Sequence, residues 1–161
     1  MKRAVYAGSF DPITNGHLWM VDQGARLFNE LIVAVGINAS KKYRWPLAER
    51  LAMLQESLHL FPNVTVASYE NLFLMDYARQ VKADFILRGV RNEQDYAYER
   101  SMRYINAEFN DQIQTVFLIP PRHLVEVSSS FVNGLVGPNG WQKILANYVP
   151  APVLQRFLNE T

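Results

Sequence analysis

The sequence predicts an α/β fold of the Rossmann-like, doubly wound class. It would have a parallel five-stranded sheet in the order 3-2-1-4-5, helices on both faces and a C-terminal helical segment. Short apolar runs alternate with longer amphipathic ones, a pattern typical of βαβ units. The run LIVAVGI at residues 31–37 is apolar with little alternation, as in a strand buried on both faces. The first apolar run, AVYA, breaks at Gly8 and is followed by helix-start residues. Because parallel strands are joined by right-handed crossovers, the first strand is expected near the middle of the sheet.

The expected elements follow one another along the whole chain. Strands are expected at residues 3–7, 31–37, 63–68, 85–87 and 115–119, and helices at residues 16–28, 46–58, 72–82 and 93–109. Pro46 takes the first position of its helix, where a missing N–H costs nothing, and leucines then recur at helical spacing. From Ser128 onward the chain is helical again, with breaks at residues 137–140 and at Pro150 and Pro152. Since no internal repeat or linker is evident, residues 1–161 are expected to form a single domain.

The composition excludes several classes of protein. With 49% hydrophobic and 19% charged residues, the chain is expected to be soluble and globular. A net charge of +1 does not favour a nucleic-acid partner. The absence of cysteine excludes disulfides, zinc–thiolate sites and a cysteine nucleophile. No apolar segment suits a membrane span or a secretory signal, so we expect a cytoplasmic protein with no membrane partner.

The segment from Gly8 to His17, GSFDPITNGH, is the most informative part of the chain. A strand that breaks at a glycine and returns as a helix makes a pocket with a floor of backbone N–H groups, and the helix N-terminus adds about half a positive charge. His17 falls in the first helical turn, on the same face as Thr14. The segment therefore predicts a site for a nucleotide's phosphates. The alternative is a tight connection in which His17 is a satisfied cap residue.

A second candidate loop falls at the same place in the predicted sheet. In the order 3-2-1-4-5, the carboxyl ends of strands 1 and 4 flank the switch point at which ligands bind. Strand 1 ends at GSFDPITNGH, and strand 4 ends at RGVR, residues 88–91. Two arginines can clamp phosphates, and the glycine between them lets backbone approach a ligand closely. The topology thus predicts two phosphate-binding loops on the two sides of one crevice.

Two further polar runs follow strands at the same edge of the sheet. The SKK run at residues 40–42 comes after strand 2. A lysine there can neutralise a phosphate, although adjacent lysines are also usual in a solvated loop. The SSS run at residues 128–130 follows strand 5. One of its serines is expected to cap a helix, and the run also offers hydroxyls and amides to a triphosphate.

The long helix at residues 93–109 has both apolar and acidic candidates. Tyr98, Met102, Ile105 and Phe109 recur at helical spacing and are expected to form a packing stripe. Glu99 is either an acceptor for a ribose hydroxyl or a surface charge. The chain has no catalytic triad, zinc–histidine motif, Walker loop or Gly-x-Gly-x-x-Gly, which disfavours hydrolysis by an activated serine and standard NAD binding.

Taken in order, SFDPITNGH, SKK, RGVR with DYAYE and Asn106, and VSSSFV resemble the bacterial phosphopantetheine adenylyltransferases. These belong to the nucleotidyltransferase superfamily, which is marked by H-x-G-H. Thr14 stands where that signature has its first histidine, as is usual in this family. The resemblance covers residues 1–132. T-x-G-H alone indicates a nucleotidyltransferase, and the block from RGVR to Asn106 indicates phosphopantetheine.

The resemblance implies a role for each matching residue. The residues implied in catalysis are His17, which would bind the phosphates and stabilise the transition state, Lys41 and Arg91. The residues implied in ATP binding are Ser9, Phe10, His17, Gly89, Val90, Arg91, Glu99, Leu124, Val127, Ser128, Ser129 and Ser130. Those implied in 4'-phosphopantetheine binding are Ser9, Lys41, Leu74, Arg88 and Asn106. No residue is implied as a metal ligand, although the family uses Mg2+. It also forms homohexamers and is generally inhibited by coenzyme A.

The chain departs from the family's pattern at four places. Ala7 stands where the family commonly has proline, and Leu124 where an aromatic residue often lies beside the adenine. Asn133 stands where a lysine or arginine usually follows the serine run. The tail from Gly134 onward, with its GPNGW turn, is a poor match to the family's pattern. These departures bear on affinity and regulation more than on the type of reaction.

The sequence therefore predicts transfer of AMP from ATP to 4'-phosphopantetheine, giving dephospho-coenzyme A and pyrophosphate, the penultimate step of coenzyme A biosynthesis. His17, Lys41, Arg88, Arg91, helix N-termini and a magnesium ion would supply positive potential for this transfer. Two alternatives stay open. One is a sister nucleotidyltransferase that uses nicotinamide mononucleotide or glycerol phosphate as acceptor. The other is a nucleotide-binding sensor that has lost catalysis, and an intact His17 argues against it.

Overall fold

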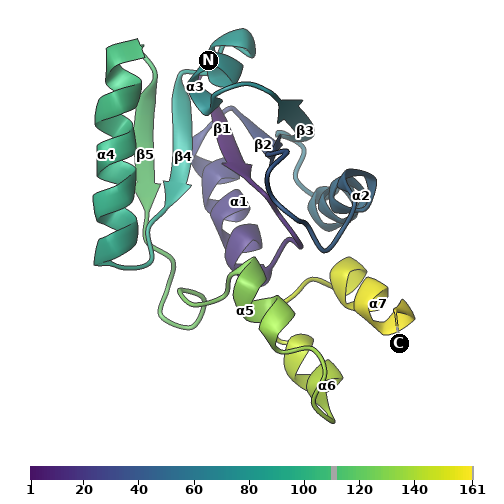
Figure 1. Cartoon of the computed structure of the whole chain (residues 1–161). Coiled ribbons are helices and arrows are strands. Elements are labelled where there is room, and N and C mark those ends of the chain that lie inside the picture. The colour runs from purple at the N-terminus through teal and green to yellow at the C-terminus, as the bar shows by residue number, and fades with distance from the viewer. Residues whose placement is uncertain (110–111, 161) are drawn as a thin grey trace.

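A parallel sheet of five strands in the order β3-β2-β1-β4-β5 forms the centre of the protein, as the sequence predicts (Figure 1). The structure, a computed structural model, describes residues 1–109 and 112–160. The strands are β1 (Arg3–Gly8), β2 (Glu30–Ile37), β3 (Val64–Glu70), β4 (Phe85–Gly89) and β5 (Gln114–Leu118). The helices are α1 (Asn15–Leu27), α2 (Leu47–Leu58), α3 (Leu74–Gln80), α4 (Glu93–Phe109), α5 (Ser129–Gly134), α6 (Trp141–Leu145) and α7 (Ala151–Asn159). Within the described ranges, no helix has both the length and the apolar character of a membrane span.

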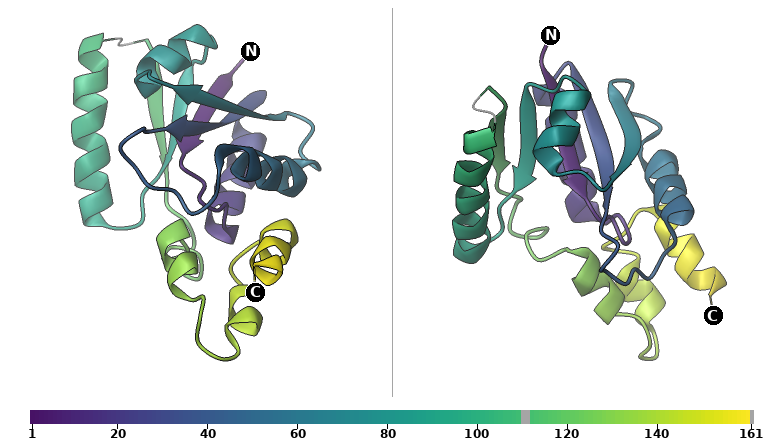
Figure 2. Two further views of the ribbon diagram at one scale, coloured as in Figure 1. Left: turned by 45° about the vertical axis from the view of Figure 1, so that its right-hand side comes forward. Right: turned by 45° about the horizontal axis from the view of Figure 1, so that its top comes forward.

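Helices cover both faces of the sheet because its central strands are apolar on both sides. On one face, Met20 of α1 and Leu54 of α2 share a buried cluster with Val33 of β2. On the other face, Met75 of α3 is buried with Ile32, the neighbour of Val33 along β2. Figure 2 shows the sheet between α1 and α3. All four strand pairs are parallel, so the carboxyl ends of the strands meet at one edge.

The predicted element boundaries differ from the structure at three informative places. β4 runs to Gly89, two residues past its predicted end, because its last two residues pair with β5. α3 is shorter than the predicted 72–82, and Lys82 lies outside it with φ 54°, in the left-handed region that helices do not continue. Pro46 is the N-cap of α2 and lies one residue before the first helical position.

The apolar stripe expected on α4 does not pack into the core. The side chains of Tyr98 and Ile105 are 61% and 45% exposed. Among the α4 side chains that the structure describes, Glu99 is the buried one, and its carboxylate pairs with Arg88 of β4. The expectation is therefore wrong for Tyr98 and Ile105, which are exposed, whereas Tyr96 of the same helix contacts Phe117 of β5 with ring centroids 6.3 Å apart. The side chain of Phe109, the last member of the stripe, falls outside the described part of the chain.

The helices that follow β5 pack against the carboxyl edge of the sheet and against α2 (Figure 1). Arg156 of α7 forms ion pairs with Glu49 at 3.0 Å and Glu56 at 2.7 Å, both on α2. Phe157 is buried, and its ring lies edge-on to Trp45 at 5.4 Å between ring centroids. The predicted break at residues 137–140 is a turn with positive φ at its two glycines. The C-terminal segment is thus a packed part of the fold beside the predicted site.

Candidate active site

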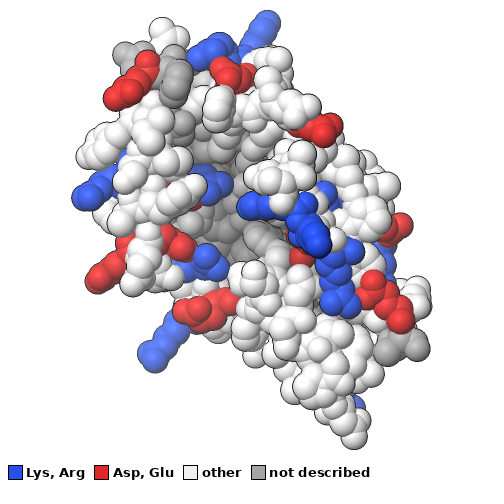
Figure 3. Space-filling view, in the orientation of Figure 1, with Lys and Arg blue, Asp and Glu red and all other residues white. Residues whose placement is uncertain are grey.

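A cavity of about 910 Å³ opens at the carboxyl ends of β1 and β4, the switch point of the sheet. Figure 3 shows lysine and arginine side chains on both sides of this hollow. The cationic residues in its lining are Lys41, Lys42, Arg44, Arg88 and Arg91. Asp11 is the single carboxylate among the described lining residues. This excess of positive charge suits a polyanionic ligand.

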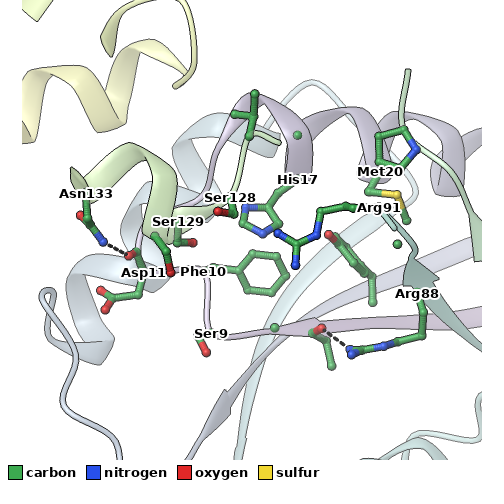
Figure 4. Close-up of a pocket in the computed structure, with 18 of the residues that line it drawn as sticks. Ser9, Phe10, Asp11, His17, Met20, Arg88, Arg91, Ser128, Ser129 and Asn133 are labelled. Atoms are coloured by element: carbon green, nitrogen blue, oxygen red, sulfur yellow. Dashed lines mark hydrogen bonds between the residues drawn. The ribbon is translucent and has the colours of Figure 1, made fainter. Parts of the chain in front are cut away.

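Most of the predicted nucleotide-site residues meet in this cavity. They come from the end of β4 and the loops after β1, β2 and β4, from the start of α1, and from the segment before α5 and its first turn. They are Ser9, Phe10, His17, Lys41, Arg88, Gly89, Arg91, Leu124, Val127, Ser128, Ser129 and Ser130. In Figure 4 the ring of His17 and the guanidinium of Arg91 lie beside each other on one wall. The four predicted loops therefore face one crevice.

The T-x-G-H run starts α1 with a reciprocal capping box. Thr14 is the N-cap: its Oγ1 accepts from the N–H of His17 at 3.3 Å, and its own N–H donates to His17 Nδ1 at 3.1 Å. Thr14 Oγ1, fully buried, also donates to the carbonyl of Val127 at 3.0 Å. At Gly16, a Cβ would lie 2.5 Å from the same carbonyl oxygen, which only glycine avoids. The run fastens α1 to the segment before α5 and fixes the ring of His17.

His17 is neutral in this site and donates through Nε2. Because the N–H of Thr14 can only donate, Nδ1 is the acceptor and the ring proton sits on Nε2. Burial, followed by the charge of Arg91, lowers the pKa of His17 from 6.5 to about 4. The ring lies edge-on to that of Phe10, with centroids 5.1 Å apart. Near pH 7 the ring is therefore neutral and offers an N–H donor rather than a charge, and its part in binding phosphates stays a prediction.

The backbone amides expected to form the floor of the site are largely used within the protein. At the start of α1, the N–H of Asn15 donates to the carbonyl of Tyr148 at 2.8 Å. The N–H groups of His17 and Leu18 donate to Thr14 Oγ1 and to the Thr14 carbonyl. These three amides thus have partners within the protein, and the cationic side chains of the cavity are further groups that can bind an anion.

The serine run is also partly used within the protein. Ser128 is the N-cap of α5, as predicted for one of the three serines, and its Oγ accepts from the N–H of Phe131 at 3.1 Å. Ser129 Oγ donates to the carbonyl of Pro12 at 2.8 Å. Ser130 is exposed at the cavity wall.

Two carboxylates of α4, one helical turn apart, hold the two arginines of the cavity. Arg91 Nε donates to Asp95 at 2.8 Å. Arg88 pairs with Glu99 and also donates from Nη1 to the carbonyl of Ala7 at 3.2 Å. Burial disfavours the charged form of Arg88, but Glu99 outweighs it, so the pKa of Arg88 lies above its usual value. The hydrogen bond to Asp95 likewise raises the pKa of Arg91. Both arginines are charged and oriented before any ligand arrives.

A second cavity of about 730 Å³ shares a wall with the first. Ser9, Lys41 and Arg88 line both cavities. From this wall the second cavity extends to Leu74, one of the predicted acceptor residues, and to the exposed Phe73. Two chambers that meet at charged side chains suit two ligands whose anionic ends must come together.

Two predicted site residues, Val90 and Glu99, are absent from the described lining of both cavities, and a third, Asn106, has a side chain outside the described part of the structure. Val90 is buried, and its N–H donates to the carbonyl of Leu118 at 2.9 Å. Glu99 lies behind Arg88 and pairs with it. Asn106 belongs to α4, but its side chain falls outside the described residues. The contacts of these three with a nucleotide or an acceptor stay predictions.

Sequence reasoning missed two buried residues beside the site. Tyr6 lines the first cavity, and burial raises the pKa of its hydroxyl above the usual range, so the hydroxyl stays protonated. Arg50 is 2% exposed, and its Nη1 donates to the carbonyl of Ser9 at 2.8 Å. Arg50 lies three residues after Leu47 and four before Leu54. A charge on the apolar face of a helix was the signal that pointed to it.

Known proteins share this sequence over nearly its whole length. A family model described as cytidylyltransferase-like matches residues 5–133. The phosphopantetheine adenylyltransferase of Chromobacterium violaceum is 52% identical over 159 residues, which cover 99% of this chain and 97% of the relative. That of Shouchella clausii is 40% identical over 153 residues, covering 95% and 94%. The alignment with the Chromobacterium violaceum relative extends over the tail after Gly134, and how closely the tail matches the family's pattern stays a prediction.

Solved structures share the fold at much lower identity. The Plasmodium falciparum nicotinic acid mononucleotide adenylyltransferase complexed with NaAD matches with a TM-score of 0.71 at 13% identity, over 99% of this chain and 96% of the other. The lipopolysaccharide core biosynthesis protein from Thermoplasma volcanium matches with a TM-score of 0.57 at 22% identity, over 73% and 96%. At these identities the likeness concerns the fold alone.

Proposed function

This chain belongs to the phosphopantetheine adenylyltransferases, and we propose that it transfers the adenylyl group of ATP to 4'-phosphopantetheine, giving dephospho-coenzyme A and pyrophosphate. The observation that carries this proposal is the wall shared by the two cavities, whose polar side chains include Ser9, Lys41 and Arg88 and which also contains Ala7, Gly8 and Tyr43. A transferase for two phosphate-bearing substrates needs a place where one phosphate can approach another. It also needs cations there to offset their repulsion.

In the proposed reaction, an oxygen of the acceptor's phosphate forms a bond to the α-phosphorus of ATP. The bond from that phosphorus to the oxygen bridging it to the β-phosphorus breaks, and pyrophosphate leaves. The acceptor is already ionised at neutral pH, since the second pKa of a phosphomonoester is about 6, so no general base is required. The nearby carboxylates are engaged elsewhere: Asp11 accepts two backbone N–H groups, and Glu99 pairs with Arg88. Catalysis is then alignment and charge compensation.

The arrangement of side chains supports a separate binding site for each substrate. At the shared wall, Ser9, Lys41 and Arg88 hold the acceptor's phosphate, and Leu74 and Asn106 follow its pantetheine arm. ATP occupies the first cavity, where the Nε2–H of His17 and the guanidinium of Arg91 stabilise charge on the α-phosphoryl group and the leaving pyrophosphate. The remaining nucleotide contacts are Phe10, Gly89, Val90, Glu99, Leu124, Val127, Ser128, Ser129 and Ser130.

Magnesium is expected to enter this site as part of the ATP complex. In the described part of the chain, no group of three or more His, Cys, Asp or Glu side chains could hold a metal ion. The carboxylate of Asp11 already accepts from two backbone N–H groups. Mg2+ is commonly held by substrate phosphates and only one or two protein carboxylates. The residues present therefore fit an ion carried by the triphosphate, where it would offset negative charge.

The same proposal extends to assembly and regulation. Tyr98, Tyr104 and Ile105 on α4 are 61%, 66% and 45% exposed, which supports their burial against other copies in a homohexamer. Coenzyme A has both an adenylate part and a pantetheine arm, so it would span both cavities and compete with both substrates. A reaction that consumes ATP belongs in the cytoplasm.

Pyrophosphate release from ATP and magnesium, with and without 4'-phosphopantetheine, tests the proposed function. The proposal expects release that depends on the acceptor. ATP binding without release in the presence of this acceptor contradicts it. Parallel assays with nicotinamide mononucleotide and glycerol phosphate then distinguish another acceptor from a sensor that has lost catalysis.

A further inference from the structure

Arg50 is a buried cation that the proposed reaction does not use. Its side chain is 2% exposed, and it is absent from the described lining of both cavities. Burying a charge is costly unless the charge has partners. Among the described residues, no carboxylate forms an ion pair with Arg50. Its partners are a carbonyl and a ring: Nη1 donates to the carbonyl of Ser9 at 2.8 Å, and Cζ lies 4.0 Å from the ring centroid of Tyr43.

These partners belong to two different loops at the cavity. Ser9 lies in the β1–α1 loop, residues 9–14, and Tyr43 lies in the β2–α2 loop, residues 38–46. The β2–α2 loop also carries Lys41. The guanidinium of Arg50, on α2, therefore contacts both loops.

Asp11 forms a second tie between the same loops. Its two carboxylate oxygens accept from two consecutive N–H groups of the β2–α2 loop, those of Arg44 at 2.8 Å and Trp45 at 2.9 Å. The hydrogen bonds to Asp11 hold the loop at Arg44 and Trp45, next to α2. The contact with Arg50 holds the loop at Tyr43, two residues from Lys41.

Tyr43 connects Arg50 to Lys41 through a turn in which Asn38 is hydrogen-bonded to both Tyr43 and Lys41. The hydroxyl of Tyr43 accepts from the N–H of Asn38 at 2.9 Å. The N–H of Lys41 donates to the carbonyl of Asn38 at 3.0 Å. Asn38 is thus bonded to Tyr43 on one side and to Lys41 on the other. A shift of the Tyr43 ring would shift the turn that presents Lys41.

We propose that Arg50 is a positioning residue, which holds the ring of Tyr43 and the carbonyl of Ser9 and thereby sets the position of Lys41 in the wall that the two cavities share. This rests on the proposed function in one respect, that the acceptor's phosphate binds at that shared wall. Arg50 acts on the acceptor through Lys41 and does not touch it. Its loss therefore weakens acceptor binding more than ATP binding.

Arg50→Met is the first test, because methionine keeps an apolar stem but has neither the charge nor the donors. Arg26→Met is the matched control, since Arg26 on α1 is a largely exposed arginine paired with Asp22 at 3.1 Å. Amide hydrogen exchange is measured on both full-length variants. We expect exchange to rise roughly tenfold in residues 9–14 and 38–46 of Arg50→Met and to stay unchanged in the control. Unchanged exchange in both loops of Arg50→Met overturns the proposal, whatever substrate the enzyme uses.

Arg50→Lys keeps the test decisive if the methionine variant does not fold. Lysine keeps the charge and a donor for the carbonyl of Ser9, but it lacks the planar group that stacks on Tyr43. Exchange is expected to rise in residues 38–46 and to stay near the wild-type rate in residues 9–14. Wild-type exchange in residues 38–46 contradicts the role of the stacking contact.

Steady-state kinetics separate positioning from general support of the fold. In Arg50→Lys we expect the KM for 4'-phosphopantetheine to rise roughly tenfold, with the KM for ATP within about twofold of wild type. Because Arg50 acts through Lys41, the double variant Arg50→Lys/Lys41→Ala should have the acceptor KM of Lys41→Ala alone. Equal rises in both KM values, or multiplied effects in the double variant, overturn the proposal. A wild-type enzyme without acceptor-dependent release refutes the proposed function instead, and hydrogen exchange still decides the role of Arg50.

Discussion

Replacing His17 by glutamine and by alanine separates the chemical role of this residue from its structural role. Glutamine at the third helical position can accept from the N–H of Thr14, as the histidine Nδ1 does at 3.1 Å, so the start of α1 is kept. The variant loses the edge contact with Phe10, whose ring centroid lies 5.1 Å away, and it replaces the rigid Nε2–H of the ring with the NH2 donor of a flexible amide. That ring contact is worth about 1 kcal/mol of unfolding free energy. The donor is worth about 10²–10³-fold in kcat, if it acts as one transition-state hydrogen bond.

The assay measures kcat from acceptor-dependent pyrophosphate release and stability from thermal unfolding of the same samples. We expect His17→Gln to unfold near the wild-type temperature and to lose less kcat than His17→Ala, because its NH2 group still offers a donor. His17→Ala is the companion variant that removes the donor. It should lose about 10²–10³-fold in kcat and a further 1 kcal/mol or so of stability, because the N–H of Thr14 then lacks its side-chain acceptor. A His17→Ala protein that folds normally and loses less than about threefold in kcat would remove His17 from the mechanism.

Three other changes test separate parts of the account. Between pH 6.5 and 4, unfolded His17 binds more protons than folded His17, so stability falls as pH falls. Acidification from about pH 7.5 to about pH 5 should cost wild type about 2 kcal/mol more than His17→Gln in urea unfolding, and equal losses contradict the low pKa. Gly16→Ala places a Cβ 2.5 Å from a backbone oxygen and should cost about 1–3 kcal/mol, whereas Gly134→Ala, with open space around it, should be near neutral in the same melts. Glu99→Gln removes the counter-ion of Arg88 and should raise the acceptor KM several-fold, roughly 1 kcal/mol. A rise in the ATP KM alone would contradict this role through Arg88 and favour the direct nucleotide contact.

The sheet order and the position of the site were predictable because both follow from local pattern and topology. The run at residues 31–37 is apolar on both sides of the strand, which is typical of an interior strand of a parallel sheet. Right-handed crossovers then limit the possible strand orders. Polar runs that follow parallel strands must meet at one edge of the sheet. The loops with Ser9, Lys41 and Arg88 therefore converge on a shared wall, as the topology requires.

The protonation state of His17 and the packing of α4 were not predictable in this way. The low pKa of His17 depends on burial and on Arg91, which is distant in the sequence. The direction of α4 is decided by the pairing of Glu99 with Arg88, and helical spacing alone does not reveal this contact. The apolar stripe through Tyr98 therefore points outward, although its periodicity is that of a core helix. Periodicity shows which residues share a face but not which face is buried.

An isotope experiment shows whether an oxygen of the acceptor's phosphate attacks the α-phosphorus of ATP. 4'-Phosphopantetheine labelled with 18O in its phosphate is incubated with unlabelled ATP, magnesium and the enzyme, and the products are examined by mass spectrometry. The account predicts that dephospho-coenzyme A retains all of the label and that pyrophosphate carries none. Label in pyrophosphate, or formation of ADP in place of pyrophosphate, would contradict it.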